Sequence, residues 1–303
     1  MRSVPPPRRA PPHERALVLA GGGSAGQAWE IGLVAGLAEG GVDLVEAELV
    51  VGTSAGSTVA AQLTSGTSPA DLYAGILDEV APSRPADVAP GPRRPSAATV
   101  GYLGWSDAVI ASARDAADMR RRMGAAALEL EESDRAGHAR WREVVAARLP
   151  SHEWPDRRVW VTAVDARSGE PVVFDRDSGV GLVDAVAAST SARTPHHVGE
   201  ERFINGGYRR SENADLAAGY GRVVVLSPFG GRSRMPAAWR MDLASQVAEL
   251  RAGGSRVEVL VPDAGAGDSF DANAMDPAAR RPAARGGHDQ GLALAASLAD
   301  LWG

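Results

Sequence analysis

The residues best suited to chemistry are a serine framed by two glycines, Gly52-Thr53-Ser54-Ala55-Gly56. The apolar run Leu49-Val50-Val51 comes before them, and small residues that suit a helix follow. A strand, Gly-x-Ser-x-Gly and a helix in this order are the pattern of a nucleophile elbow, a tight turn that presents a serine hydroxyl for attack. Glycines at 52 and 56 leave room for the turn and for close approach of other groups. We therefore expect Ser54 to be a nucleophile.

A glycine-rich loop precedes the serine and can bind a negative charge. The apolar residues 16–20 predict a strand, Gly21-Gly22-Gly23-Ser24-Ala25-Gly26 predicts a loop, and the apolar spacing from Trp29 to Leu37 predicts a helix. A loop and first helical turn of this kind carry unpaired backbone N–H groups. The anion would be a cofactor phosphate or the oxyanion of an acyl-transfer intermediate.

The same glycines fit the G-x-G-x-x-G pattern of dinucleotide-binding folds through Gly21, Gly23 and Gly26. That pattern requires an acidic residue at the end of the second strand, about twenty residues on, to bind the ribose. The second strand predicted here, 48–51, runs instead into the Gly-Thr-Ser-Ala-Gly segment. This argues against a nucleotide site.

Gly21-Gly22-Gly23-x-x-Gly26, followed by Gly52-Thr53-Ser54-Ala55-Gly56, resembles the patatin-like phospholipase family, its bacterial members in particular. Family members use a Ser-Asp dyad without histidine, and the aspartate lies in an Asp-Gly-Gly or Asp-Gly-Ala motif. The matching segment is Asn205-Gly206-Gly207, and the resemblance covers residues 16–228. It implies a serine hydrolase of lipid acyl esters, phospholipase A-like, with its oxyanion hole at Gly21, Gly22, Gly23 and Gly26. It implies no cofactor and no metal.

Two residues depart from the family pattern. Ala25 stands where the family usually has arginine or lysine, and Asn205 stands at the position of the aspartate. An asparagine amide can accept a hydrogen bond from the Ser54 hydroxyl but cannot take up its proton. General-base catalysis contributes roughly 10²- to 10⁴-fold in rate, so we expect poor turnover from the sequence as it stands.

Four explanations of Asn205 are open at this point. It is an engineered replacement, a natural loss of activity, a position whose role another carboxylate has taken, or an asparagine that deamidates to an acid because Gly206 follows it. Asp215 is a weak substitute, since its context suggests a helix start. The competing function is a non-catalytic protein that binds acyl lipids or regulates another process on the same scaffold.

A Ser-Asp-His triad of the α/β-hydrolase type is a further alternative, because Gly-x-Ser-x-Gly also marks that fold. Asp263 and His288 could complete it. Two features count against it: the serine comes early in the chain, and the glycine-rich loop follows the first strand. The pair His196-His197 suggests a metal, but adjacent histidines on a loop point in different directions and no third ligand is suitably spaced.

Composition sets the class of protein. The 303 residues, 44% of them hydrophobic, can bury one large core. The βα units along the chain and the resemblance to the patatin-like family imply an α/β fold, a three-layer sandwich with a largely parallel central sheet. The net charge of −6 gives no reason to expect nucleic acid as a partner. No signal peptide and no apolar run long enough to span a membrane is seen, so we expect a cytoplasmic protein. Peripheral membrane contact and the oligomeric state stay open.

The chain divides into a Pro/Arg-rich tail over residues 1–15, expected to be disordered, and a single domain over 16–303. A long irregular connection is expected over 81–100, and Tyr102 to Trp105 would form a lipid-facing lid or pack on the core. Residues 106–149 predict a helical insertion that could supply an acyl-binding wall. A C-terminal helix is expected over 288–301.

Overall fold

The computed structural model describes residues 14–79, 97–131, 137–263 and 274–303. One eight-stranded sheet runs through these residues in the order β5-β6-β3-β2-β1-β7-β8, with β4 paired to β3. Its strands are β1 (Arg15–Leu19), β2 (Leu49–Gly52), β3 (Arg158–Asp165), β4 (Pro171–Phe174), β5 (His196–Val198), β6 (Glu201–Asn205), β7 (Arg222–Leu226) and β8 (Arg256–Leu260).

The strands nearest the predicted nucleophile are parallel. β1 pairs in parallel with β2 and β7, β2 with β3, and β7 with β8. The antiparallel pairs involve β4, β5 and β6 at the other edge. The prediction of a largely parallel sheet is confirmed. The carboxyl ends of β1 and β2 meet at one edge, where α/β folds place their ligands.

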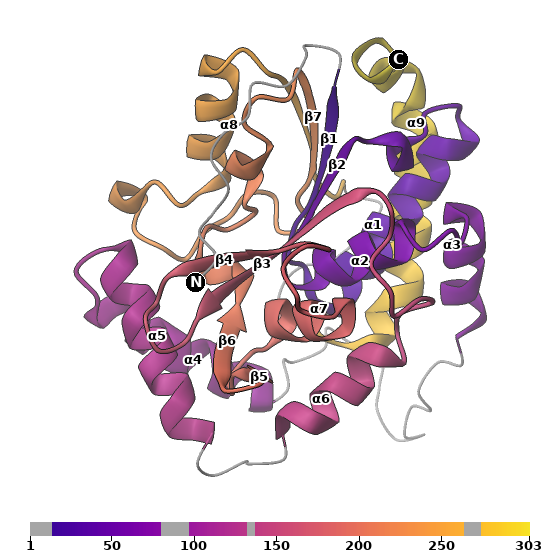
Figure 1. Cartoon of the computed structure of the whole chain (residues 1–303). Coiled ribbons are helices and arrows are strands. Elements are labelled where there is room, and N and C mark those ends of the chain that lie inside the picture. The colour runs from indigo at the N-terminus through magenta and orange to yellow at the C-terminus, as the bar shows by residue number, and fades with distance from the viewer. Residues whose placement is uncertain (1–13, 80–96, 132–136, 264–273) are drawn as a thin grey trace.

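Helices cover both faces of the sheet. They are α1 (Gly23–Glu39), α2 (Ala55–Leu63), α3 (Pro69–Asp78), α4 (Ala97–Ser112), α5 (Ala116–Glu131), α6 (Gly137–Ala146), α7 (Leu182–Thr190), α8 (Leu243–Ala252) and α9 (Arg280–Trp302). Leu17 and Leu19 of β1 pack in the cluster formed with α1, α2 and α9, whereas Ala16 and Val18 pack toward α8. Figure 1 shows α8 on one side of the central strands and α1, α3 and α9 on the other, which confirms the three-layer α/β architecture.

Helices α1 and α9 pack with their backbones in close contact. A Cβ at Gly32 would lie 2.1 Å from the carbonyl oxygen of Ala284, and one at Gly287 would lie 2.4 Å from that of Trp29. Helix α9 begins at Arg280 rather than at the predicted His288, so the part that packs on α1 includes residues before His288. Gly287 looks like a helix breaker in the sequence, but here it allows the two helices to approach.

Among the residues described between α3 and β3 there are three helices, and their bounds differ from the sequence prediction. Helix α4 begins at Ala97, so the helical region starts before residue 106 and includes the end of the expected irregular connection. The rest of that connection, residues 80–96, lies outside the described residues. Trp105 of α4 is half-buried and packs beside Met119 and Met123 of α5. Of the two alternatives for Tyr102 to Trp105, a lipid-facing lid or packing on the core, the contact of Trp105 agrees with packing on the core.

Residues 14 and 15, which the sequence prediction assigned to the tail, belong to the described part of the chain. Residues 1–13 lie outside the described residues, but Arg15 already belongs to β1 and the Glu14 carbonyl accepts hydrogen bonds from the N–H groups of Gly221 and Arg222. Within the described part of the chain, none of the helices has the length and apolar character needed to cross a membrane.

Candidate active site

Ser54 lies on a sharp turn between β2 and α2. Its backbone has φ 53° and ψ −124°, a conformation that side-chain-bearing residues rarely adopt and that clusters at functional sites. The Ser54 N–H donates to the hydroxyl of Ser189 at 2.9 Å, and the Ser57 hydroxyl donates to the Ser54 carbonyl at 2.6 Å. The first bond anchors the strained turn to α7, and the second anchors it to the first turn of α2.

The turn rests directly on the end of β1. A Cβ at Gly56 would lie 2.2 Å from the Leu19 carbonyl oxygen and 2.6 Å from that of Ala20. The Thr53 N–H also donates to the Leu19 carbonyl at 3.0 Å. Only glycine fits at position 56, and the close contact ties the serine turn to the strand that leads into the glycine-rich loop.

The glycine-rich loop lies beside the serine. A Cβ at Gly21 would be 3.2 Å from Ser54 Cβ and 3.7 Å from its Oγ. The Ala25 N–H donates to the Ala274 carbonyl at 2.9 Å. Among the described residues, no hydrogen bond uses the N–H of Gly22 or Gly23. The structure therefore places beside the serine a loop in which two N–H groups have no partner among the described residues.

Asn205 ends β6, and its side chain meets Ser54. Asn205 Nδ2 donates to Ser54 Oγ at 3.1 Å, and Asn205 Oδ1 accepts from the Gly207 N–H at 2.9 Å. The Gly207 N–H sets the orientation of the Asn205 amide, because a reversed amide would place its NH₂ group against this N–H, donor against donor. Sequence reasoning expected the amide to accept a hydrogen bond from Ser54, but the structure has it donating one.

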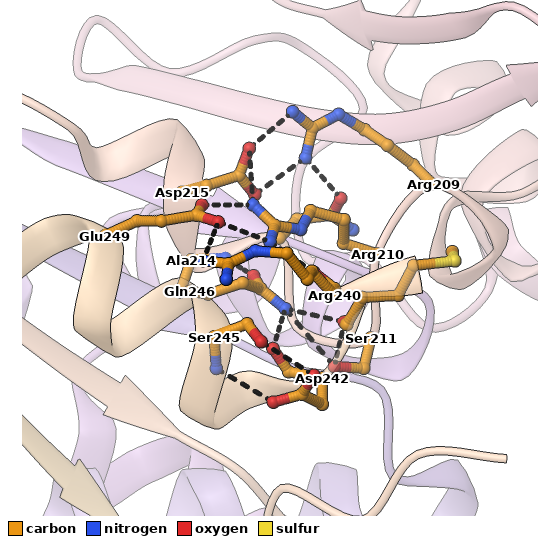
Figure 2. Close-up of polar contacts among 12 residues, drawn as sticks. Arg209, Arg210, Ser211, Ala214, Asp215, Arg240, Asp242, Ser245, Gln246 and Glu249 are labelled. Atoms are coloured by element: carbon orange, nitrogen blue, oxygen red, sulfur yellow. Dashed lines mark hydrogen bonds and ion pairs between the residues drawn. The ribbon is translucent and has the colours of Figure 1, made fainter. Parts of the chain in front are cut away.

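Asp215 lies in an ion pair and is not free to replace a base at position 205. Arg209 donates to both of its carboxylate oxygens, at 2.9 and 2.7 Å, and Arg210 Nη1 lies 3.6 Å away (Figure 2). Burial raises the pKa of Asp215, but the hydrogen bonds from Arg209 and the charges of both arginines outweigh it, so the pKa lies below its ordinary value. Both oxygens of the Asp215 carboxylate are therefore engaged by these arginines.

Glu212 and Asn213 lie next to the serine turn, and sequence reasoning overlooked both. The Thr53 hydroxyl donates to the Glu212 carbonyl at 3.3 Å, and Asn213 Nδ2 donates to the Thr53 hydroxyl at 2.9 Å. Burial raises the pKa of the Glu212 carboxyl, against smaller lowering by hydrogen bonds from Ser211 and Ser227. Two polar residues just before a short helix were the available signal, but such residues usually cap it.

His288 lies far from Ser54. Its Nε2 is 3.0 Å from Glu39 Oε2, and its ring stacks on Tyr73. Glu39 is the last residue of α1, and the glycine-rich loop stands at the first, roughly 24 Å away along the helix at 1.5 Å per residue. The Ser-Asp-His alternative therefore has no support in the geometry.

The adjacent histidines have different partners. His196 Nε2 is hydrogen-bonded to Asp184 Oδ1 at 3.0 Å, whereas the His197 ring stacks on His138 with 3.6 Å between ring centroids. Across the described residues, no group of three or more His, Cys, Asp or Glu side chains is placed to hold a metal ion.

The chain resembles proteins of known family. The sequence pattern of the family described as patatin-like phospholipase matches residues 17–218. No curated protein sequence matches the chain. Among solved structures, VipD from Legionella pneumophila aligns with a TM-score of 0.44 and 13% identity, covering 98% of this chain and 70% of VipD. The type III effector protein ExoU aligns with a TM-score of 0.38 and 18% identity, covering 93% of this chain and 54% of ExoU. The family pattern spans well over half of the sequence, and the chain belongs to the patatin-like phospholipase family.

Proposed function

We propose that this protein is a serine acyl-ester hydrolase of the phospholipase A type whose dyad consists of Ser54 and the residue at position 205. The observation that carries the proposal is the direct contact of 3.1 Å between Ser54 Oγ and the side chain at position 205. Membership of the family supports lipid acyl esters, phospholipids included, as the substrate class.

In the proposed reaction, Ser54 Oγ attacks the ester carbonyl carbon and the carbonyl oxygen becomes an oxyanion. The N–H groups of Gly21, Gly22 and Gly23 in the loop and of Ala55 in the elbow are the candidate donors to that oxyanion. The predicted donor Gly26 is excluded, because its N–H already donates to the Gly22 carbonyl at 2.9 Å. The alcohol leaves, and water then hydrolyses the acyl-serine. The residue at position 205 has to accept the Ser54 proton during attack.

Asn205 cannot accept that proton, and its amide donates to Ser54 Oγ instead. General-base catalysis contributes roughly 10²- to 10⁴-fold, so the protein with Asn205 turns over slowly. The same hydrogen bond favours the second candidate function, a protein that binds an acyl lipid without hydrolysing it.

Helices α4 and α5 are the proposed wall for the acyl chain and the proposed contact with a lipid surface. Tyr102 of α4 shares a hydrogen bond of 2.8 Å with Tyr208, three residues after Asn205, so α4 reaches the site. The first ten residues of α4 carry no charge, and Val100 is 55% exposed.

The test is Asn205→Asp, assayed with short- and long-chain p-nitrophenyl esters and with phospholipid vesicles. We expect turnover to rise about 10²- to 10⁴-fold and to be lost again when Ser54→Ala is added. Intact mass before each assay excludes deamidation of Asn205 in the parent protein. A correctly folded Asn205→Asp protein with no gain in turnover would favour the binding function.

A further inference from the structure

Asn213 joins the serine turn to the segment that follows Asn205. Its side chain is fully buried, and its Nδ2 lies within hydrogen-bond distance of three acceptors: the Thr53 hydroxyl at 2.9 Å, the Gly206 carbonyl at 3.1 Å and the Thr162 hydroxyl at 3.2 Å. Thr53 directly precedes Ser54, and Gly206 directly follows Asn205. One amide group therefore contacts the chain neighbours of both halves of the proposed dyad.

The direction of the Asn213 amide is set from its other side. Arg209 Nη1 donates to Asn213 Oδ1 at 2.8 Å, so the NH₂ group has to face Thr53 and Gly206. Arg209 is itself held by its two hydrogen bonds to Asp215. Asn213 also has φ 60°, a left-handed conformation that asparagine tolerates better than most residues. Although it precedes a short 3-10 helix, its side chain makes no capping bond there.

The segment that carries Asn213 is anchored to α8. The Ala214 N–H donates to Gln246 Oε1 at 2.7 Å, and Gln246 Nε2 donates to the Met241 carbonyl at 3.0 Å. Figure 2 shows Gln246 among these partners, with the Arg209–Asp215 pair beside them. Gln246 is fully buried, so this anchor is shielded from solvent. The backbone that carries Asn213 is therefore held in place by α8 while its side chain contacts the site.

We propose that Asn213 is a positioning residue that sets the placement of Ser54 relative to the side chain at position 205. The proposal rests on the proposed hydrolase function and adds to it a residue that touches neither the substrate nor Ser54 Oγ. β2 and β6 are not adjacent in the sheet, since β3 lies between them. Thr162, the third acceptor, lies on β3. The Asn213 amide therefore links the end of β2 to the end of β6 across β3, the strand between them.

The proposal is tested through the Thr53 hydroxyl, because removing it leaves Asn213 and its other partners in place. Thr53→Val removes the acceptor with little change of shape, and Thr53→Ser retains it. Asn213→Gly removes the whole side chain but tolerates the left-handed backbone. Ser255→Ala is the matched control, since Ser255 is buried and donates to the Tyr220 carbonyl at 2.6 Å just before β8, at the opposite edge of the sheet.

All four substitutions are made in the Asn205→Asp protein, and turnover is expressed per Ser54 titrated with a fluorophosphonate. This measure corrects for unfolded protein, which a purely structural role would increase. We expect kcat per titrated site to fall about 10- to 100-fold in Thr53→Val and Asn213→Gly, with KM unchanged, because a displacement of about 1 Å costs up to 10²-fold. Thr53→Ser should restore it, and Ser255→Ala should lower only the melting temperature.

Equal kcat per titrated site in the Thr53→Val and Thr53→Ser proteins would overturn the proposal. A crystal structure of Thr53→Val with Asn205 retained gives a readout that does not need activity. We expect the separation between Asn205 Nδ2 and Ser54 Oγ to exceed the 3.1 Å found here, and an unchanged separation would count against the role of Asn213. If Asn205→Asp is inactive, the proposed function fails, and this distance alone decides the role of Asn213.

Discussion

Replacing Gly56 by alanine tests whether the serine turn depends on its contact with β1. The added methyl would stand 2.2 Å from the Leu19 carbonyl oxygen, 2.4 Å from its carbon and 2.6 Å from the Ala20 oxygen. Close contacts between carbon and carbonyl oxygen lie at about 3.3 Å or more, so the gap has to open by about 1 Å. All three atoms belong to the backbone, which cannot rotate aside. Overpacking of this kind costs about 1–3 kcal/mol, which is the loss of unfolding free energy we expect.

The same displacement should reach the site, because Gly21 follows Ala20 and lies against Ser54. A shift of about 1 Å can cost up to 10²-fold in reactivity, so fluorophosphonate labelling of Ser54 in the Asn205→Asp protein should slow by at least tenfold. Urea unfolding measures the stability. Gly75→Ala on α3 is the control: nothing lies within 4 Å of its Cβ position, so helix propensity should stabilise it by up to about 1 kcal/mol with labelling unchanged. Parent-like urea unfolding and labelling of Gly56→Ala would refute the reasoning.

Two carboxyls, buried Glu30 and half-buried Asp215, should give opposite pH dependences of stability. Burial raises the pKa of Glu30 well above its ordinary value, so the folded protein holds this proton to higher pH than the unfolded chain, where the carboxyl ionises above about pH 4.3. Parent stability then falls with rising pH by up to about 1.4 kcal/mol per unit, and Glu30→Gln should remove this slope in urea unfolding from pH 5 to 8. Equal slopes of unfolding free energy against pH in the parent and Glu30→Gln proteins would contradict this role of Glu30. Asp215 has a lowered pKa, so its contribution is present at neutral pH and lost as pH falls through its folded-state pKa. Asp215→Asn should cost about 2 kcal/mol at pH 7 and clearly less at pH 3, and an equal loss at both would argue against the ion pair.

The serine turn and the glycine-rich loop could be predicted from sequence because each is a local pattern. An apolar strand followed by glycines and a helix predicts one βα unit, and two successive units with parallel strands bring their loops to the same edge. The contact of 3.2 Å between the Gly21 Cβ position and Ser54 Cβ follows from that topology. Position 205 has no such local signal, and it was found through the family resemblance.

The remaining features depend on contacts between distant segments. Helix α9 begins at Arg280, and its Gly287 meets the backbone of α1, a partner that nothing in the local sequence shows. The side chain of Asn213 contacts Thr53, 160 residues away in sequence, so the common capping role was the natural interpretation. The direction of the Asn205 amide depends on the Gly207 N–H, a backbone donor placed by the turn after β6.

The surroundings of position 205 suit a carboxylate better than the amide that occupies it. Two groups that are able to donate a hydrogen bond lie beside this side chain, the Gly207 N–H and the Ser54 hydroxyl. A carboxylate accepts from both, whereas an amide accepts from only one and then needs an acceptor for its NH₂ group. Asn205 finds that acceptor in Ser54 Oγ, so the Ser54 proton has to point elsewhere. Exchanging one NH₂ group for oxygen would reverse this hydrogen bond without moving either residue. The proposed difference between binding an acyl ester and hydrolysing it therefore lies in the direction of one hydrogen bond rather than in the fold.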